Sequence, residues 1–218
     1  MQLGTGHLQN GRYPAALREL IAAERLDPRN PFIQNNLGLT YYLREQLDLA
    51  AKHLARAVQI EPRYTDARNN LARVFIDKKE FDKAIEQLNV AREDLTYPFP
   101  EKTYLNLGLA YFHNQQFEKA RDKLLISIRH EREGCYSNTL YGRTLYELKD
   151  FRTAATTLDR AIGFCSQSSF EEPHFFSALS YLRMGRRDEA RSRFQEIISL
   201  YPESIYARRS RALLERTQ

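Results

Sequence analysis

Small and apolar side chains recur along this chain at a nearly constant spacing, and this periodicity constrains the fold more than any other feature. The first series steps by 34, 34, 36, 34 and 36 residues: Gly4, Gly38, Ala72, Gly108, Gly142 and Ala178. Two further series keep the same steps: Ala16, Ala50, Ala84, Ala120, Ala154 and Ala190, and Leu20, Leu54, Leu88, Leu124, Leu158 and Phe194. Three series in one register indicate about six copies of a single structural unit.

One copy, residues 31–62, reads as two amphipathic helices joined by a short turn. Asn30 followed by Pro31 is a strong helix start, because the amide side chain caps the helix and proline suits its first position. A glycine inside a helix costs roughly 1 kcal/mol relative to alanine. Gly38 is therefore expected to allow close approach of the second helix, where Ala50 is the matching small residue. Pro62 ends that second helix.

This register resembles the tetratricopeptide repeat (TPR), whose period is 34 residues. The resemblance implies an all-α fold, a right-handed α-α superhelix of about six repeats with a C-terminal capping helix. We expect one solenoid over residues 1–218 with repeats at 1–30, 31–64, 65–98, 101–134, 135–168 and 171–204 and a capping helix over 204–216. Ile205, Ala207, Leu213 and Leu214 are expected to cover the open end of the core, since a solenoid terminus must shield it.

Two junctions carry two extra residues each, one near 95–102 and one near 163–173. The first, LTYPFPEK, contains two prolines, and it is expected to alter the angle between repeats three and four or to present Tyr97 and Phe99 at the surface. The first helix also looks short, with three residues before Gly4 where seven precede Gly38. We therefore expect the natural polypeptide to begin upstream, with any leader or lipid-attachment cysteine outside these residues.

Composition excludes a membrane-spanning helix, because no apolar run approaches the roughly 20 residues required. The net charge is +5, and much of the excess lies in the last 36 residues, where arginines are interleaved with acidic side chains. Two interpretations remain open: a solvated outer helix face, which we favour, or a contact with an acidic partner such as a lipid surface, glycan or nucleic acid. No nucleic-acid-binding motif is present, and nucleic acid is not expected as a partner.

Both cysteines of the chain, Cys135 and Cys165, bracket one predicted hairpin. Antiparallel helices bring those two ends together, so a disulfide is geometrically feasible if the Cα atoms lie within about 7 Å. It would close a loop of about 30 residues and imply an oxidising compartment, in a bacterium the periplasm. Two reduced thiols are the alternative, and we favour the disulfide.

Nothing in the sequence indicates an enzyme. The five histidines share no metal-ligand spacing. The sequence contains no zinc-protease motif, no serine-hydrolase motif and no phosphate-binding loop. We expect no catalytic residue, no metal and no cofactor.

The first helices of stacked TPR hairpins line a concave face, where we predict a groove for an extended or helical peptide with aromatic anchors. Partial burial against neighbouring helices is the alternative for each residue. By helical spacing the groove residues are Phe32, Asn35, Leu39, Tyr42, Asn69, Arg73, Ile76, Leu105, Leu109, Phe112, Thr139, Arg143, Tyr146, Phe175, Leu179 and Leu182. The paired lysines that grip a partner's terminal carboxylate in some TPR proteins are missing, since Phe32 and Asp66 occupy the corresponding positions.

Two local segments, together with the total of about six repeats, point to one group within the TPR proteins. Residues 91–112, AREDLTYPFPEKTYLNLGLAYF, and residues 198–215, ISLYPESIYARRSRALLE, look like the type IV pilus biogenesis and stability lipoproteins, the PilF/PilW/Tgl-type pilotins. The resemblance implies a monomeric lipoprotein on the periplasmic side of the bacterial outer membrane, held there by an N-terminal lipid absent from this chain. It would bind the pilus secretin and promote secretin multimerisation, and so support pilus biogenesis and twitching or social motility. Repeats one to three and the 95–99 junction are the leading contact candidates.

Two other functions remain open. The first is a generic TPR scaffold in another periplasmic or cytoplasmic complex. The second is the regulatory half of an enzyme whose catalytic domain lies elsewhere in the polypeptide.

Overall fold

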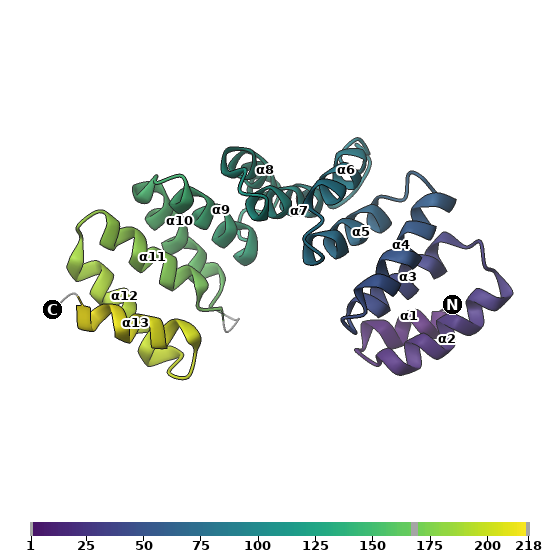
Figure 1. Cartoon of the computed structure of the whole chain (residues 1–218), viewed down its shortest axis with the longest axis horizontal. Coiled ribbons are helices and arrows are strands. Elements are labelled where there is room, and N and C mark those ends of the chain that lie inside the picture. Colours follow the sequence, from purple (N-terminus) through teal and green to yellow (C-terminus); the bar gives the residue numbers. More distant parts are fainter. Residues whose placement is uncertain (1, 167–169, 217–218) are drawn as a thin grey trace. The chain divides into compact units, whose positions relative to one another are not determined.

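The computed structural model describes residues 2–166 and 170–216, and its regular structure there is entirely α-helical (Figure 1). The chain separates into two compact units, Met1–Asn114 and Gln115–Gln218. Unit 1 contains α1 (Gln2–Gln9), α2 (Tyr13–Leu26), α3 (Pro31–Tyr42), α4 (Leu47–Ile60), α5 (Thr65–Asp77), α6 (Phe81–Ala91) and α7 (Pro100–His113). Unit 2 contains α8 (Phe117–His130), α9 (Cys135–Glu147), α10 (Phe151–Phe164), α11 (Glu172–Arg183), α12 (Arg187–Leu200) and α13 (Ile205–Arg216).

These helices confirm the predicted fold class of consecutive helical hairpins with an added C-terminal helix. The expected end of the fifth repeat at residue 168 lies outside the described residues. A single continuous solenoid over both units stays a prediction.

The start of α3 shows how local sequence defines a helix end. The Asn30 side-chain oxygen accepts hydrogen bonds from the amides of Phe32, at 3.0 Å, and Ile33, at 3.3 Å. Two of the amides that lack partners inside the helix are thereby satisfied.

Glycines at the helix crossings have the predicted packing role. A Cβ atom added at Gly38 would lie 2.5 Å from Leu54 Cγ and 3.1 Å from the Ala50 carbonyl oxygen. One added at Gly142 would lie 2.5 Å from Leu158 Cγ. The small-residue series therefore marks the points where the paired helices approach most closely.

The turn inside each hairpin places one residue in the left-handed region of backbone space. Gly11 and Gly185 occupy this position in the first and last hairpins, with φ of 70° and 77°. In the four hairpins between them, a non-glycine residue occupies this position, with φ from 58° to 64°: Glu45, Lys79, Gln115 and Lys149. The steps between these six residues repeat the 34- and 36-residue spacing of the small-residue series.

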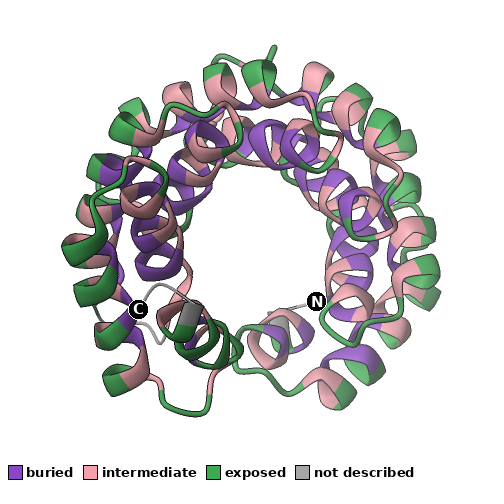
Figure 2. Cartoon of the chain, turned by 60° about the vertical axis from the view of Figure 1, so that its left-hand side comes forward, coloured by how far each residue is buried: buried purple, intermediate pink, exposed green. Residues whose placement is uncertain are grey.

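In the α3–α4 and α11–α12 hairpins the first helix buries more residues than the second; Figure 2 colours the chain by burial. In unit 1, α3 buries six residues and α4 three, and in unit 2, α11 buries six and α12 three. The reason is that α3 packs against α2, α4 and α5, and α11 against α9, α10, α12 and α13, whereas α4 and α12 each expose one face to water.

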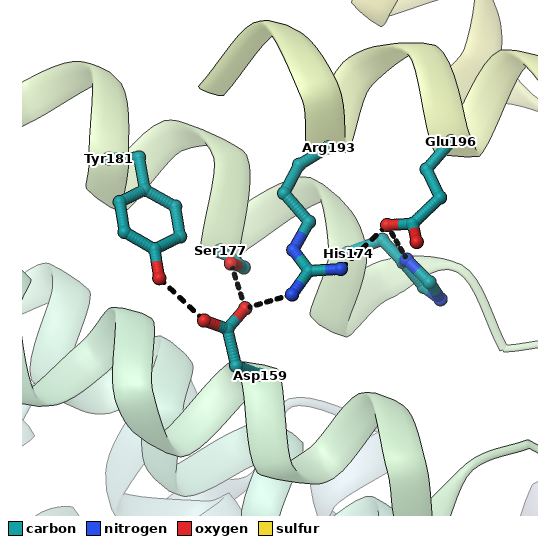
Figure 3. A network of polar contacts seen from close by, with 6 residues as sticks. All are labelled: Asp159, His174, Ser177, Tyr181, Arg193 and Glu196. Carbon is teal, nitrogen blue, oxygen red and sulfur yellow. Dashed lines mark hydrogen bonds and ion pairs between the residues drawn. The ribbon is translucent and has the colours of Figure 1, made fainter. Parts of the chain in front are cut away.

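A polar network joins α10, α11 and α12 in unit 2 (Figure 3). The Asp159 carboxylate accepts hydrogen bonds from Ser177, at 2.7 Å, and Tyr181, at 2.6 Å, and pairs with Arg193 at 3.0 Å. Arg193 also pairs with Glu196 at 2.7 Å, and Glu196 lies 3.3 Å from the buried His174 ring. Asp159 thus holds the last two hairpins together through three donors.

The predicted disulfide is present. Cys135 at the start of α9 is bonded to Cys165 just after α10, and their Cα atoms are 5.0 Å apart. The bond closes the α9–α10 hairpin at the end opposite its turn.

The prediction for the capping helix is correct except at one residue. Ala207, Leu213 and Leu214 of α13 join the core cluster around Phe194, but Ile205 is 52% exposed. Ile205 lies at the first position of α13 on the same face as Arg208 and Arg209, and that face is turned away from the core.

Candidate functional site: the first-helix faces

The predicted groove residues of unit 1 divide into accessible and buried groups. Phe32 is 55% exposed, and Leu39, Tyr42, Arg73 and Leu105 are half-buried. The remaining predictions in this unit are buried: Asn35, Asn69, Ile76, Leu109 and Phe112. The accessible residues alone are placed to touch a partner, and we call this set the unit 1 face.

Aromatic rings line the ends of the unit 1 face where its first helices begin. The Phe32 ring lies 5.1 Å from the Tyr64 ring, and the Tyr97 and Phe99 rings meet edge to face at 5.9 Å. Partial burial and the nearby Asp66 carboxylate raise the pKa of Tyr64 to about 12, so its hydroxyl stays protonated. These rings present apolar surface at low entropic cost, as interface anchors do.

The insertion near residues 95–102 was predicted to present Tyr97 and Phe99 at the surface, and only Phe99 is exposed. Phe99 is 46% exposed, with the Lys102 ammonium 3.9 Å from its ring centroid. Tyr97 is half-buried, because its hydroxyl donates to Asp66 at 2.6 Å and ties the junction to α5. Leu95, which precedes them, is 95% exposed.

A tyrosine and an arginine occupy the centre of the unit 1 face. The Tyr42 hydroxyl donates to Asp77 at 2.7 Å, and burial together with this carboxylate raises the Tyr42 pKa, although the neighbouring Arg73 opposes the shift. The Arg73 Nε atom is buried and has no hydrogen-bond partner among the described residues. No ion pair engages the Arg73 guanidinium within that part of the chain. The half-buried Arg73 side chain thus places a positive charge beside the Tyr42 hydroxyl at the centre of this face.

Asparagine side chains link neighbouring first helices across unit 1. Asn70 donates to the Asn35 side-chain oxygen at 2.9 Å, and Asn106 donates to that of Asn69 at 3.2 Å. Asn69 in turn donates to the Thr103 hydroxyl at 2.9 Å. This amide ladder satisfies buried polar groups internally, so Asn35 and Asn69 serve packing and not partner contact. The recurrence of asparagine at repeat spacing is the sequence signal that marks it.

The corresponding face of unit 2 is closed by its own charges. Arg143 pairs with Glu172, and its guanidinium lies 4.7 Å from the Phe176 ring centroid. Burial raises the pKa of Glu172, and the Arg143 charge opposes the shift. The Tyr146 ring packs 5.7 Å from Phe176, so the predicted groove residues of α9 are engaged with α11.

The other predicted positions of unit 2 are less accessible than expected. Phe175 is buried against Phe194 and Tyr206, with ring centroids 6.0 and 4.9 Å away. Leu179 and Leu182 are half-buried around the same core cluster, and the buried Thr139 hydroxyl donates to the Cys135 carbonyl. Phe175 and Thr139 thus have structural contacts that helical spacing alone does not reveal.

Two other kinds of site are absent from residues 2–166 and 170–216. No group of three histidine, cysteine, aspartate or glutamate side chains there is placed to hold a metal ion. In the same residues, no helix has the length and apolar character needed to cross a membrane.

Family models agree with this architecture. Three models, each described as tetratricopeptide repeat, match residues 1–65, 41–96 and 177–204, which together are more than half of the chain. The chain belongs to the tetratricopeptide repeat family. Proteins built of this repeat are in general scaffolds that bind other proteins and have no catalytic centre.

Solved structures extend the likeness of this TPR chain over nearly its full length. PilW, a widely conserved type IV pilus biogenesis factor, has a TM-score of 0.88 at 18% identity, covering 98% of this chain and 96% of PilW. PilF of Pseudomonas aeruginosa has a TM-score of 0.84 at 22% identity, covering 97% and 94%. YrrB, a TPR protein with an unusual peptide-binding site, has a TM-score of 0.69 at 12% identity, covering 88% and 97%. At these identities the likeness establishes the fold. None of the curated proteins matches the chain.

Proposed function

We propose that this TPR chain is a non-enzymatic pilotin that binds the secretin of a type IV pilus and promotes secretin multimerisation in the outer membrane. The single observation that carries the proposal is the full-length structural likeness to PilW and PilF, both of similar length to this chain. Other TPR proteins among the solved structures, such as YrrB, match with clearly lower TM-scores. The oxidised Cys135–Cys165 pair further supports a periplasmic location.

The unit 1 face is the proposed secretin-binding surface. It combines exposed Phe32, half-buried Leu39 and Tyr42, and the positive charge of half-buried Arg73. An apolar secretin segment would bury these side chains, and an acceptor on that segment would engage Arg73. Tethering the face beside the membrane through an upstream lipid would raise its local concentration where secretin rings form.

Deletion of the gene in the source organism tests the pilotin function. We expect the detergent-resistant secretin multimer to be lost from membrane fractions and to return when the full-length lipidated protein is supplied. A normal multimer in the deletion strain would refute the proposal and leave a TPR scaffold of another complex.

Substitution of Phe32 by aspartate tests the proposed surface. Placing a carboxylate where an aromatic anchor is buried by a partner typically costs 2 kcal/mol or more, so we expect secretin binding to fall at least roughly 30-fold in a pull-down titration. Leu49→Asp is the matched control, since Leu49 is also exposed but lies on the outer helix α4. Phe112 is unsuitable for this test because it is buried. Equal binding by the Phe32 and Leu49 variants, with helicity retained, would contradict the assignment of the unit 1 face.

A further inference from the structure

The C-terminal helix presents basic and apolar side chains together on one exposed face. Ile205, Arg208, Arg209 and Ala212 follow the i, i+3, i+4, i+7 spacing of a single helix face, and all four are exposed. Leu200, at the end of α12 and five residues before Ile205, is 57% exposed. We call these five residues the α13 face.

The core side of α13 is firmly anchored, so its outer face keeps a fixed orientation. Ala207 is fully buried, and the Tyr206 ring lies 4.9 Å from Phe175. The Ala207 amide donates to the Ser204 hydroxyl at 3.0 Å, and Arg211 donates to the Pro202 carbonyl at 2.9 Å. These contacts fix the turn that carries Leu200 and Ile205 relative to the arginines.

Arginines outnumber acidic residues in the C-terminal part of the chain, although the exposed Glu215 lies seven residues after Arg208 on the same side of α13. Residues 183–216 contain nine arginines and five acidic residues. Two of the carboxylates are already committed, Glu189 to Arg186 and Glu196 to Arg193. Among the residues that the structure describes, no ion pair engages Arg208 or Arg209.

We propose that the α13 face docks on an anionic phospholipid surface. Basic side chains near such a surface bind its phosphate groups, and flanking leucine and isoleucine side chains enter the boundary between headgroups and acyl chains. A lipid surface has no fixed shape, which suits exposed apolar side chains that protrude singly. Nucleic acid phosphates would leave Leu200 and Ile205 without a favourable contact. This docking is independent of the secretin-binding proposal and of any upstream lipid.

Vesicle co-sedimentation of the chain as it stands tests the proposal. We expect binding to vesicles containing phosphatidylglycerol, weakening as salt rises, and little binding to phosphatidylcholine vesicles. Each basic side chain near an anionic surface strengthens binding by roughly fivefold, so Arg208→Glu with Arg209→Glu should weaken it at least roughly tenfold. Leu200→Ser with Ile205→Ser should weaken binding at every salt concentration.

A matched pair of arginines controls for net charge. Arg12 and Arg44 are exposed in turns of unit 1, so Arg12→Glu with Arg44→Glu changes the total charge equally. Retained vesicle binding by this control, with loss in the Arg208 and Arg209 variant at unchanged helicity, supports the α13 face. Equal losses in both variants, or no binding by the parent chain to anionic vesicles, would overturn the proposal. Binding of an acidic protein in place of the vesicles would also overturn it.

Discussion

The two units join their repeats by different chemistry. Unit 1 connects neighbouring first helices through neutral amides, as in the Asn69–Asn106 and Asn35–Asn70 contacts. Unit 2 connects its last two hairpins through charges centred on Asp159, and a disulfide between Cys135 and Cys165 closes the α9–α10 hairpin within one repeat. The difference affects which surface is accessible, because the charged groups of unit 2 occupy its own first-helix face whereas the amides of unit 1 leave an apolar face accessible. The accessible apolar face and the disulfide thus lie in different units.

Removal of the disulfide is the strongest expected perturbation of this division. Cys135→Ser with Cys165→Ser frees a loop of about 30 residues, and the chain-entropy model gives a loss of roughly 3–4 kcal/mol. We expect hydrogen exchange to accelerate throughout unit 2 while protection in unit 1 is retained. Parent protein treated with reductant should behave like the double variant. An equal loss of protection in unit 1 would show that the two units unfold as one.

Loss of the Asp159 carboxylate should cause the second-largest decrease in the free energy of unfolding. Asp159→Ala leaves Ser177, Tyr181 and Arg193 without their shared acceptor, and the free energy of unfolding should fall by about 2–3 kcal/mol. Urea denaturation measures the change. Asp122→Ala is the control, since Asp122 is exposed and pairs only with the adjacent Arg121, and less than about 0.5 kcal/mol is expected. A comparable loss in both variants would mean that the network does not act as a unit.

The amide ladder of unit 1 should tolerate change better. Asn69→Ala removes the acceptor of Asn106 and a donor to Thr103, and the expected loss is about 1–2 kcal/mol. Hydrogen exchange should report it in α5 and α7. Asn89→Ala, on the second helix α6, makes no ladder contact and serves as control. A loss larger than that of Asp159→Ala would reverse the proposed ranking of the two units.

The pH dependence of stability offers a further comparison, because each unit holds a histidine beside a carboxylate: His174 is buried in unit 2 and His53 is half-buried in unit 1. Burial lowers the pKa of His174 in unit 2 against the opposing charges of Glu196 and Asp159, and Arg193 adds to the lowering. Burial likewise lowers the pKa of His53 in unit 1 against Glu24. The folded state therefore binds protons less readily than the unfolded state, so stability is fully present above about pH 6.5 and falls as the pH drops below it.

Substitution separates the two histidines. In the His174→Gln variant, hydrogen-exchange protection of unit 2 should fall less as the pH is lowered than it does in the parent protein. In the His53→Gln variant, the same should hold for the protection of unit 1. Each effect is expected to be at most about 1 kcal/mol. If stability falls with pH in both variants as it does in the parent protein, other titratable groups cause the loss of stability in acid.

Sequence periodicity predicts the helices well because the same small residues must recur wherever two helices cross closely, as at Gly38 and Gly142. The disulfide is also predictable in part: the sequence favours it because the first and last residues of one hairpin meet at its open end, although two reduced thiols remain possible until the 5.0 Å Cα separation is known. Helical spacing does not identify which residues a neighbouring helix covers. Phe112 and Phe175 fall on the predicted groove face yet are buried, and Phe32 on the same face is exposed.

The side-chain networks are harder to foresee than the helices. Asp159, Ser177 and Arg193 belong to three different helices, and none of them recurs at repeat spacing. Their association depends on rotamers and on the relative rotation of α10, α11 and α12, which no local pattern encodes. The amide ladder recurs in the sequence, but its recurrence alone does not distinguish an internal contact from a partner contact.

The left-handed turns indicate how readily this architecture can be altered by mutation. A non-glycine residue in that conformation carries a steric penalty of roughly 1–2 kcal/mol, and Glu45, Lys79, Gln115 and Lys149 each carry it where Gly11 and Gly185 do not. Since the four turns lie in different hairpins, replacements by asparagine or glycine should act nearly additively. Substitutions at these turns of the inner repeats can therefore raise the free energy of unfolding, in evolution or by design, without any change to the residues proposed to face a partner.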